Sequence, residues 1–397
     1  MIEIVVVGAG MYSIGRGTDG FGTIVPAVCE WSKQVENDVV IHLVGSKGNN
    51  NAALQEKIRA FKKMSATKVD FRIWPEQDGH NPLEYERVLN IVVNPLCCII
   101  AVPDDLHFPI AKSAITKKIP TLVVKPLTPT CQEAETLIAL SDEYNTYGCV
   151  EFHKRFDSAN LMLRDYFRSG ELGQILYSVV EYSQRVAIPK EIFRSWVESS
   201  NIFQYLGVHY VDIIKFVTGA YPVRLSALGQ KFELFQQGIN TPDSIQCSIE
   251  WAFPDSGSKF IQTLHLNWID PETSPAMSNQ RIKLIGTKGR VESDQTNRGL
   301  SVYSANTGYN TPNPYFCTRF GSEYGSMYWA GYGIDSIRGF CNDCLELSLG
   351  LVDKKTLETI RSSFRESFCS TAVVEACNTS LRLNGEWVIV KTESEKL

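Results

Sequence analysis

The chain has 397 residues, which predicts two domains, and its net charge of −5 argues against a nucleic-acid-binding surface. Its apolar runs, such as IVVVG at residues 4–8, are far too short to span a membrane. Strand-like sequence begins at Ile2 with no basic stretch or cleavage site before it, which predicts a cytoplasmic protein without a signal peptide. The eleven cysteines are scattered through apolar segments and are expected to be reduced core thiols.

Strands and helices alternate from residue 2 to residue 152. Strands are expected at 2–8, 39–45, 97–102, 121–124 and 147–152, and helices at 23–34, 51–61, 107–118 and after Thr130. Thr130 and Glu133 form the pattern of a capping box at the start of the last of these helices. The alternation predicts an α/β fold in which residues 1–152 form a Rossmann dinucleotide-binding domain with a parallel sheet.

The rhythm changes after residue 153. A helix capped by Asp157 and a second helix that ends at Gly219 precede a series of strands. The strands are expected at 223–230, 243–253, 259–268, 281–286 and 290–294, and further helices at 334–348 and 366–383. GTKG at 286–289 is typical of a hairpin turn. This order predicts that residues 153–397 form an α+β domain with a large, mostly antiparallel sheet, for substrate binding and oligomerisation.

Assembly is predicted from this second sheet. Strands such as SIQCSIEW at 244–251 are expected to be apolar on both faces. One face would then cover helices and the other would pair with a second subunit. A homodimer or homotetramer is therefore expected.

A glycine-rich stretch, VVVGAGMYSIGRGTDGFG at residues 5–22, follows the first strand. Gly8 and Gly10 are typical of the turn that approaches a pyrophosphate, although Ser13 stands where the third glycine of G-x-G-x-x-G belongs. A helix N-terminus after the turn would supply amide donors. The cofactor-binding residues expected here are Gly8, Gly10, Met11, Tyr12 and Ser13. The alternative is a mobile glycine-rich surface loop.

The second strand ends in Gly45, Ser46 and Lys47, where dinucleotide-binding domains often place a carboxylate on the ribose. A hydroxyl and a cation suit a 2′-phosphate better. Ser46 and Lys47 are therefore expected to bind the cofactor and to favour NADP slightly over NAD. The alternative is that Lys47 is a solvated loop residue.

Lys125 follows the apolar strand TLVV, with Pro126 behind it. The strand ends at the carboxyl edge of the sheet, where open α/β folds bind ligands. A fixed cation at that edge would stabilise a developing alkoxide. The alternative is a strand-end lysine that reaches solvent.

Several segments together resemble the Gfo/Idh/MocA oxidoreductases, the family of glucose–fructose oxidoreductase and inositol dehydrogenase. They are the strand with G-x-G, AVPDDLH (101–107), VVKPL (123–127), RSGELGQI (168–175), GVHYVD (207–212) and IKLIGTKGRVE (282–292). The resemblance extends over nearly the whole chain. It implies an NAD(P)-dependent oxidoreductase that transfers a hydride between nicotinamide and a hydroxyl-bearing carbon of a sugar, cyclitol or sugar derivative, without a metal.

The resemblance also implies catalytic residues. Lys125 matches the lysine of the family's Glu-Lys-Pro motif, in which Val124 replaces the glutamate. His209 matches the family's general acid/base, and Tyr205 replaces an aspartate that usually stands four residues before it. Imidazole suits proton transfer near neutral pH, but a buried structural histidine is the alternative. The positions expected beside the cofactor are Val102, Pro103, His107, Lys125 and Pro126.

Substrate-binding residues are expected from the interdomain segments. EFHKRF at 151–156 follows the last strand of the first domain, and its alternative interpretation is a solvated charge cluster. The residues expected to contact substrate are His153, Arg155, Gln184, Arg194, Trp196 and Asp212.

Two other functions remain open at the level of sequence. Some members of the family use bound NAD in glycosidic-bond cleavage, so a redox-assisted glycoside hydrolase is one alternative. The missing acidic residues make a non-catalytic NAD(P)-binding regulator the other.

Overall fold

The computed structural model describes residues 1–48, 51–323 and 325–392. The chain divides into two compact units. The first unit contains residues 1–128, 132–153 and 315–367, and the second contains 129–131, 154–314 and 368–397. Within the described ranges, no helix is both long enough and apolar enough to cross a membrane.

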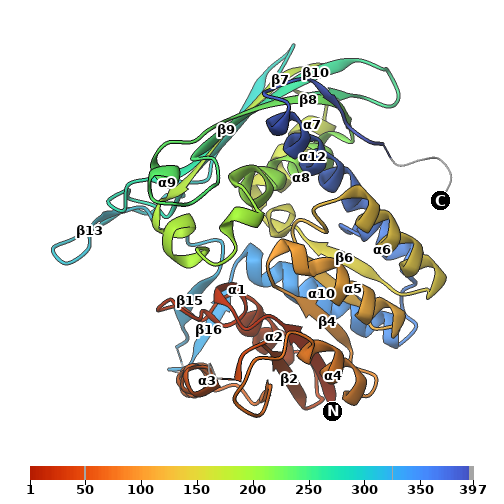
Figure 1. Ribbon diagram of the computed structural model, residues 1–397, viewed down its shortest axis with the longest axis vertical. Helices are drawn as coiled ribbons and strands as arrows, with labels where there is room; N and C mark the ends of the chain where they lie inside the picture. Colours follow the sequence, from red (N-terminus) through yellow and green to blue (C-terminus); the bar gives the residue numbers. More distant parts are fainter. Residues whose placement is uncertain (49–50, 324, 393–397) are drawn as a thin grey trace. The chain divides into compact units, whose positions relative to one another are not determined.

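The first unit is built on a parallel sheet with the strand order β3-β2-β1-β4-β5-β6 (Figure 1). Its strands are β1 (Ile2–Val7), β2 (Val39–Val44), β3 (Asp70–Trp74), β4 (Cys97–Ile100), β5 (Thr121–Val124) and β6 (Gly148–Glu151). The order reverses between β1 and β4, which is the switch point where such sheets bind ligands at their carboxyl ends. The Rossmann-type fold predicted for this region is confirmed, and β3 is an additional strand that the pattern analysis did not identify.

Helices connect these strands. They are α1 (Met11–Ile14), α2 (Ile24–Ser32), α3 (Asn51–Ser65), α4 (Glu84–Ile91), α5 (His107–Thr116) and α6 (Cys131–Glu143). Short 3-10 turns at Asp104–Leu106 and His153–Phe156 follow β4 and β6. The segment after residue 314 adds the hairpin β15 (Thr318–Gly321) and β16 (Met327–Ala330), with α10 (Tyr332–Ser348) and α11 (Lys354–Ile360).

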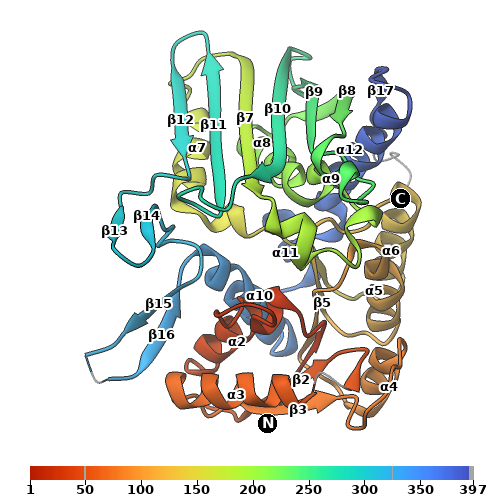
Figure 2. The ribbon, with the colours of Figure 1, turned by 60° about the vertical axis from the view of Figure 1, so that its left-hand side comes forward.

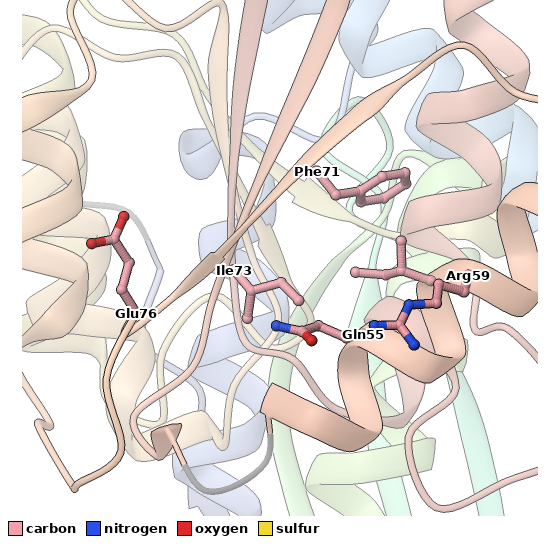
Figure 3. A pocket seen from close by; sticks show the side chains of 6 residues that line it. Gln55, Arg59, Phe71, Ile73 and Glu76 are labelled. Atoms are coloured by element: carbon pink, nitrogen blue, oxygen red, sulfur yellow. The ribbon is translucent and has the colours of Figure 1, made fainter.

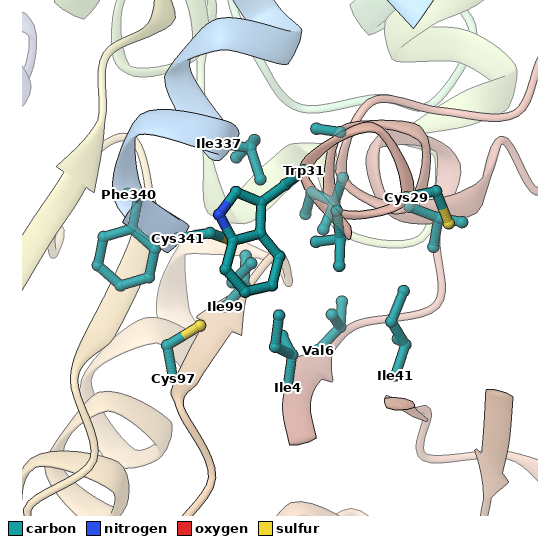
Figure 4. Close-up of a cluster of buried hydrophobic side chains, with 14 of the residues drawn as sticks. Ile4, Val6, Cys29, Trp31, Ile41, Cys97, Ile99, Ile337, Phe340 and Cys341 are labelled. Carbon is teal, nitrogen blue, oxygen red and sulfur yellow. The ribbon is translucent and has the colours of Figure 1, made fainter. Parts of the chain in front are cut away.

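The core of the first unit explains why α10 belongs to it. Trp31 of α2 is fully buried against Ile337 and Cys341 of α10 and against β4 (Figure 4). Its Nε1 donates a hydrogen bond of 2.7 Å to Oδ1 of Asn342. The expected division after residue 152 placed this segment in the second domain. In the structure, α10 instead belongs to the first compact unit. It does so because it covers an apolar face of that unit which residues 1–152 leave uncovered.

The second unit is built on a mixed sheet with the order β12-β11-β7-β10-β9-β8-β17 (Figure 2). Its strands are β7 (Ile175–Arg185), β8 (Tyr221–Gln230), β9 (Ser244–Ala252), β10 (Lys259–Asp270), β11 (Ser278–Gly286), β12 (Arg290–Asp294) and β17 (Val388–Ile389). Of the strand pairs described for this sheet, only β7–β10 is parallel. The prediction of a mostly antiparallel sheet is therefore confirmed. A two-stranded ladder of β13 (Val302–Ser304) and β14 (Gly308–Asn310) follows β12.

Helices α7 (Ser158–Arg168), α8 (Val208–Thr218) and α12 (Phe364–Arg382) accompany this sheet, and the short α9 (Glu233–Gln236) follows β8. Local signals at their ends agree with the sequence. Asp157 accepts a hydrogen bond of 3.1 Å from the amide of Ala159, and Gly219 ends α8 in the left-handed conformation. The GTKG turn joins β11 to β12 through a Gly286 to Gly289 backbone bond of 2.8 Å.

Strand β9 corrects one expectation. Ile245, Cys247, Ile249 and Trp251 are buried on one side of it, and Ser244, Gln246 and Ser248 alternate with them. The expectation that this strand is apolar on both faces is therefore wrong, because a period of two leaves its other face polar.

Candidate active site

The turn after β1 contains two glycines that are needed for different reasons. Gly8 has φ of +108°, and a Cβ there would overlap the carbonyl oxygen of Ala101 at the end of β4. Gly8 therefore lets β1 and β4 approach each other. A Cβ on Gly10 would meet no atom of the described chain within 4 Å. Packing therefore does not require glycine at Gly10, and its expected contact with a pyrophosphate stays a prediction.

The segment that follows is a folded loop and not a continuous helix. Helix α1 ends after one turn at Gly15, which is left-handed with φ of 72°. A Cβ on Gly15 would collide with the backbone of Gly20 and Gly22. Lys57 of α3 donates a hydrogen bond of 2.6 Å to the carbonyl of Thr18. The glycines thus close residues 15–22 tightly on themselves.

The expected cofactor residues in α1 differ in exposure. Met11 and Tyr12 are half-buried, whereas Ser13 is fully buried, and its Oγ has no hydrogen-bond partner among the described residues. The Ser13 hydroxyl points into the protein, so a contact with a cofactor from this residue would come from its backbone.

The loop after β2 presents Ser46 and Lys47 to solvent. It is held by the segment after β3, because Gly48 donates to Gly79, Asn81 donates to Ser46, and Lys47 pairs with His80 in an isolated bridge. Within the described ranges, the side chain of Lys47 makes no hydrogen bond and no ion pair. Lys47 is thus an exposed cation after the end of β2, and its role in cofactor binding stays a prediction. His80 is a second basic residue that the strand pattern did not identify.

His107 joins the ends of β4 and β5. The ring is fully buried, with Nδ1 at 2.8 Å from the carbonyl oxygen of Pro126 and Nε2 at 3.0 Å from that of Val102. The ring therefore links the segments that follow β4 and β5, which carry Pro103 and Lys125. The expected contact of His107 with a cofactor stays a prediction.

Lys125 stands immediately after β5. Burial lowers the pKa of its ammonium to about 8, and the carboxylates of Asp104 and Glu151 oppose that shift. Asp104 is buried in the turn after β4, and Glu151 is the last residue of β6. The residue is partly buried, and its catalytic role stays a prediction.

Glu151 is a residue that the pattern analysis missed. It lies opposite Val124 in the β5–β6 register, and it is almost fully buried. Its carboxylate faces Nδ1 of His153 at 3.0 and 3.1 Å and accepts a hydrogen bond of 2.9 Å from Ser336 of α10. The sequence did contain a signal for Glu151, because its carboxylate stands at the end of a buried strand. Burying a charge is costly unless it is paired, so such a residue is expected to have a partner.

His153 lies within a group of aromatic rings. Phe316 and Tyr332 contact its ring at centroid distances of 5.1 and 5.7 Å, and Oη of Tyr12 lies 3.4 Å from Nδ1. Burial raises the pKa of Tyr12 well above its ordinary value, and the negative charge of Glu151 adds to this shift. The carboxyl ends of β1, β5 and β6 therefore bring together a cation, a carboxylate, an imidazole and a phenol.

The expected proton-transfer residues belong to the second unit. His209 is buried in the first turn of α8, and Tyr205 lies in a π-helical turn, Phe203–Gly207, just before it. The π turn means that the i, i+4 spacing of a regular α-helix does not apply between them. Tyr205 packs edge-on against Phe193 at 4.8 Å. Gly207 permits close packing, because a Cβ there would press on Leu266.

The cluster after β6 is paired and not solvated. Arg155 donates to both carboxylate oxygens of Asp212 at 2.6 and 2.9 Å, and both side chains are buried. Lys154 is fully buried and donates to Oε1 of Gln295 at 2.9 Å and of Gln280 at 2.5 Å. Arg155 and Asp212, two residues expected to bind substrate, thus neutralise each other's charge.

The remaining expected substrate residues lie along one stretch of the second unit. Gln184 is the last residue but one of β7 and is buried, and its Oε1 has no hydrogen-bond partner in the described part of the chain. Trp196 packs against Phe193 at 4.3 Å, and Arg194 is exposed, with Glu198 at 3.6 Å. Their role in substrate binding stays a prediction.

The cysteines form no disulfide, and nine of the eleven are buried, as expected for core thiols. Cys341 and Cys344 lie in α10, where a hydrogen bond with Cys97 and burial raise the pKa of Cys341 well above its ordinary value. Thiols of this kind are protonated and poorly reactive. Among the described residues no group of three or more His, Cys, Asp or Glu side chains is arranged to hold a metal ion.

A surface pocket lies between α3 and β3 (Figure 3). Gln55, Ile58 and Arg59 line it from α3, and Phe71, Ile73 and Glu76 line it from β3 and the residues after it. None of the expected cofactor or substrate residues is among them, so this pocket does not mark the site.

Two family models match the chain. The model described as "Oxidoreductase family, NAD-binding Rossmann fold" matches residues 2–152, and the model described as "GFO/IDH/MocA C-terminal domain" matches residues 161–292. The chain belongs to the Gfo/Idh/MocA oxidoreductase family. The resemblance inferred from its motifs is thereby confirmed.

Curated relatives from this family match parts of the chain. The rhizopine catabolism protein MocA of Rhizobium meliloti is 26% identical over 159 residues, which are 40% of this chain and 49% of that protein. The inositol 2-dehydrogenase of Rhizobium meliloti strain 1021 is 21% identical over 231 residues, 57% of this chain and 66% of that protein. The chain thus spans about half to two thirds of the length of these relatives.

Solved structures of the family share the fold over nearly the whole chain. The scyllo-inositol dehydrogenase of Lactobacillus casei, with bound cofactor NAD(H) and scyllo-inositol, has a TM-score of 0.67 at 14% identity and covers 98% of this chain and 99% of that chain. A myo-inositol dehydrogenase from Corynebacterium glutamicum has a TM-score of 0.65 at 14% identity, with 99% and 100% covered. At this identity the likeness establishes the fold.

Proposed function

We propose that the protein is an NAD(P)-dependent dehydrogenase that oxidises a secondary alcohol of a sugar, cyclitol or sugar derivative, or reduces the corresponding ketone. The observation that carries the proposal is the place of Lys125 at the carboxyl edge of a dinucleotide-binding sheet, where burial lowers the pKa of its ammonium to about 8 and the charges of Asp104 and Glu151 oppose that shift. Family membership and the inositol dehydrogenases with the same fold support a polyhydroxylated substrate.

The residues of the first unit fit a nicotinamide dinucleotide. The space in front of Gly10 suits the pyrophosphate, and the loop of Ser46 and Lys47 suits the adenosine ribose. When bound, the cofactor supplies the hydride acceptor or donor. A cation beside Ser46 favours a 2′-phosphate, so we propose a preference for NADP over NAD.

Lys125 and His209 are proposed to act on the reacting alcohol. Lys125 donates a hydrogen bond to the hydroxyl oxygen and stabilises negative charge as the proton leaves. His209 is an imidazole that accepts that proton, and Tyr205 donates or accepts a hydrogen bond without carrying a charge. Alkoxide stabilisation by Lys125 needs the protonated amine, so this contribution declines as the pH rises through about 8.

The proposal is tested by incubating the protein with NAD⁺ or NADP⁺ and a panel of inositols, sugars and glycosides. Reduction of the cofactor, followed at its near-ultraviolet absorbance, is the expected result. Release of an aglycone without net reduction would identify a redox-assisted glycoside hydrolase instead. Cofactor binding without either reaction would identify a regulator.

Cofactor preference is tested separately by fluorescence titration of NADPH and NADH. Lys47→Ala is expected to weaken NADPH binding by about 10-fold, the scale of one charged contact, and to leave NADH binding nearly unchanged. Lys117→Ala, which removes an exposed lysine after α5, is the matched control. Equal affinities of the native protein for the two cofactors would contradict the preference.

We also propose that the protein assembles as a homodimer or homotetramer. The polar side of β9 is no obstacle, because subunit interfaces away from their cores are polar as well. Sedimentation velocity at micromolar concentration is expected to show a species larger than 44.5 kDa. A monomer over the whole concentration range would contradict assembly.

A further inference from the structure

We infer that His80, paired with Lys47, binds the 2′-phosphate of the cofactor and makes the preference for NADP depend on pH. The inference rests on the proposed function and adds to it a specificity-determining contact from the loop after β3. The sequence patterns selected no cofactor residue in that loop. His80 is exposed, as Lys47 is, so both side chains can reach a ligand from solvent.

The backbone holds the two side chains on one face. Lys47 and His80 are partners in an antiparallel bridge between the loops after β2 and β3. Two backbone hydrogen bonds flank them, from Gly48 N–H to Gly79 C=O at 2.9 Å and from Asn81 N–H to Ser46 C=O at 2.8 Å. Lys47 and His80 are therefore the pair without mutual hydrogen bonds, the arrangement in which opposed side chains lie closest and on the same face.

The loop that carries His80 is packed from both sides. A Cβ on Gly48 would overlap the carbonyl oxygen of Gln77, so the loop after β3 lies directly against the loop after β2. On the other side, Nδ2 of Asn81 donates a hydrogen bond of 2.8 Å to Glu84 at the start of α4. These contacts fix the backbone of His80 relative to Lys47.

The bridge lies where the ribose end of the cofactor is proposed. Strands β2 and β3 are parallel neighbours, with Val44 opposite Trp74 at their carboxyl ends. Residues 46–48 and 79–81 follow these ends, so they lie beyond the carboxyl edge of the sheet. Like charges placed directly opposite each other are unfavourable, whereas an anion between them relieves the repulsion and accepts charge-assisted hydrogen bonds from both. Two basic side chains on one face therefore suit a phosphate.

The charged groups around His80 come from its own loop, the loop after β2 and helix α4. They are Lys47, Glu76, Asp78, Glu84 and Arg87. Glu84 accepts hydrogen bonds from Asn81 and, at 2.9 Å, from Nε of Arg87. Glu76 lines the pocket between α3 and β3, and Asp78 is exposed, where solvent screens its charge. The charge that lies opposite His80 in the bridge is that of Lys47.

Protonation of the His80 ring couples this contact to pH. Histidine is the side chain that changes charge between about pH 5 and 8, and only its protonated ring is a cation. The contact is therefore strongest at low pH and is lost as the pH rises. A phosphate monoester gains its second charge near about pH 6, which acts in the opposite direction but equally in every variant.

Fluorescence titration of NADPH and NADH at pH 6.5 and 8.5 tests the inference. In the native protein the affinity for NADPH relative to NADH is expected to fall by about 10-fold between the two pH values, the scale of one charged contact. His80→Gln should keep this ratio low at both pH values, and His80→Lys, which retains a cation, should keep it high at both. Unchanged NADH binding in each variant shows that the site is folded. His265→Gln, which removes an exposed histidine from β10, is the matched control and should behave as the native protein does.

The His80 ring provides a second readout that does not depend on activity. The chain has six histidines, and the imidazole NMR signal that is lost in His80→Gln assigns this ring. The midpoint of its titration should move to higher pH when NADP⁺ is bound, because a nearby anion favours the protonated ring. With NAD⁺, which lacks the 2′-phosphate, the midpoint should stay in place. An equal midpoint with the two cofactors would overturn the contact.

The outcomes separate this inference from the proposed function. A native affinity ratio that is the same at both pH values, or a His80→Gln variant that keeps the native fall, overturns the role of His80 and leaves the proposed dehydrogenase intact. A protein that binds NADH but no NADPH at either pH overturns both the role and the preference for NADP. A native protein that binds neither cofactor contradicts the proposed function, and the inference falls with it.

Discussion

Lys125 is singled out by its motif in the sequence and by its environment in the structure. A strand-end lysine in water has no reason for a lowered pKa, whereas burial at the edge of β5 lowers the pKa of Lys125 to about 8. Val124 cannot supply the opposing charge, and Asp104 and Glu151 do so from neighbouring strand ends. The local sequence is enough to identify the lysine, whereas the assembled sheet brings in the two carboxylates that act on its pKa.

We predict that Lys125→Met keeps the fold and lowers turnover by roughly 100-fold or more, the scale of one preorganised charge. The loss should not be recovered at high pH, because the missing element is a fixed positive charge. His209→Asn should also impair turnover but regain part of it toward pH 10, since hydroxide can replace a lost base. Steady-state rates from pH 6 to 10, with circular dichroism as the folding control, check both.

Lys117→Met is the control for losing a lysine at an exposed position. Near-native turnover of a folded Lys125→Met variant would show that the lysine has no catalytic role.

His42 links stability to pH. The buried ring accepts from Nε1 of Trp74 at 3.2 Å through Nδ1 and meets Glu3 at 3.1 Å through Nε2, an arrangement that satisfies the neutral imidazole. Burial lowers its pKa, although Glu3 opposes the shift. The unfolded chain therefore takes up a proton at a higher pH than the folded protein does, so this residue's contribution to the free energy of unfolding decreases as the pH falls through 6.5.

We predict that His42→Gln is less stable than the native protein at pH 7.5 but loses less stability between pH 7.5 and pH 5.5. Urea denaturation at the two pH values measures the difference. His265→Gln, which removes an exposed histidine from β10, is the control. An unchanged pH dependence in His42→Gln would mean that another group governs stability in this range.

At the level of elements, the two glycines in the turn between β1 and α1 are predicted to have different roles, one in packing and one in cofactor binding. Gly8→Ala places a Cβ against the carbonyl oxygen of Ala101 at a left-handed φ, so it should destabilise the protein by about 1–3 kcal/mol. Gly10→Ala meets no atom of the described chain within 4 Å, so it should leave stability nearly unchanged and weaken cofactor binding by 10-fold or more.

Thermal unfolding and cofactor titration of the two variants provide the measurement. The contrast between them is the control, because both add the same methyl group. A Gly10→Ala variant that binds cofactor as tightly as the native protein would place the pyrophosphate elsewhere.

At the level of the whole molecule, residues 315–367 complete the first unit. Trp31 is buried beneath Ile337 and Phe340, and Phe364 packs against Gly148 of β6. We predict that a fragment of residues 1–152 does not unfold cooperatively, because an apolar face of its α2 and β4 is left in water. The same fragment joined by a flexible linker to residues 315–367 should regain a cooperative urea transition, followed by tryptophan fluorescence.

Residues 260–312, joined by the same linker to residues 1–152, form the length-matched control. Cooperative unfolding of residues 1–152 alone would show that α10 is dispensable for that unit.

The sequence by itself determined the local features of this protein. Alternating strands and helices, the Asp157 cap, the Gly219 end of α8 and the GTKG hairpin follow from short-range sterics and hydrogen bonding, and each appears as predicted. The motifs were also sufficient to identify the family. These features need no knowledge of distant residues, because a cap, a turn or a motif is complete within a few positions.

Tertiary structure decided which side chains face each other. Glu151 and Val124 are far apart in sequence but opposite in register, and Arg155 meets Asp212 across 57 positions. The π turn at Phe203–Gly207 changed the spacing between Tyr205 and His209, and α10 joined the first unit from the far end of the chain. Charge pairing and apolar burial depend on distance in space, and that distance is set when the sheet assembles.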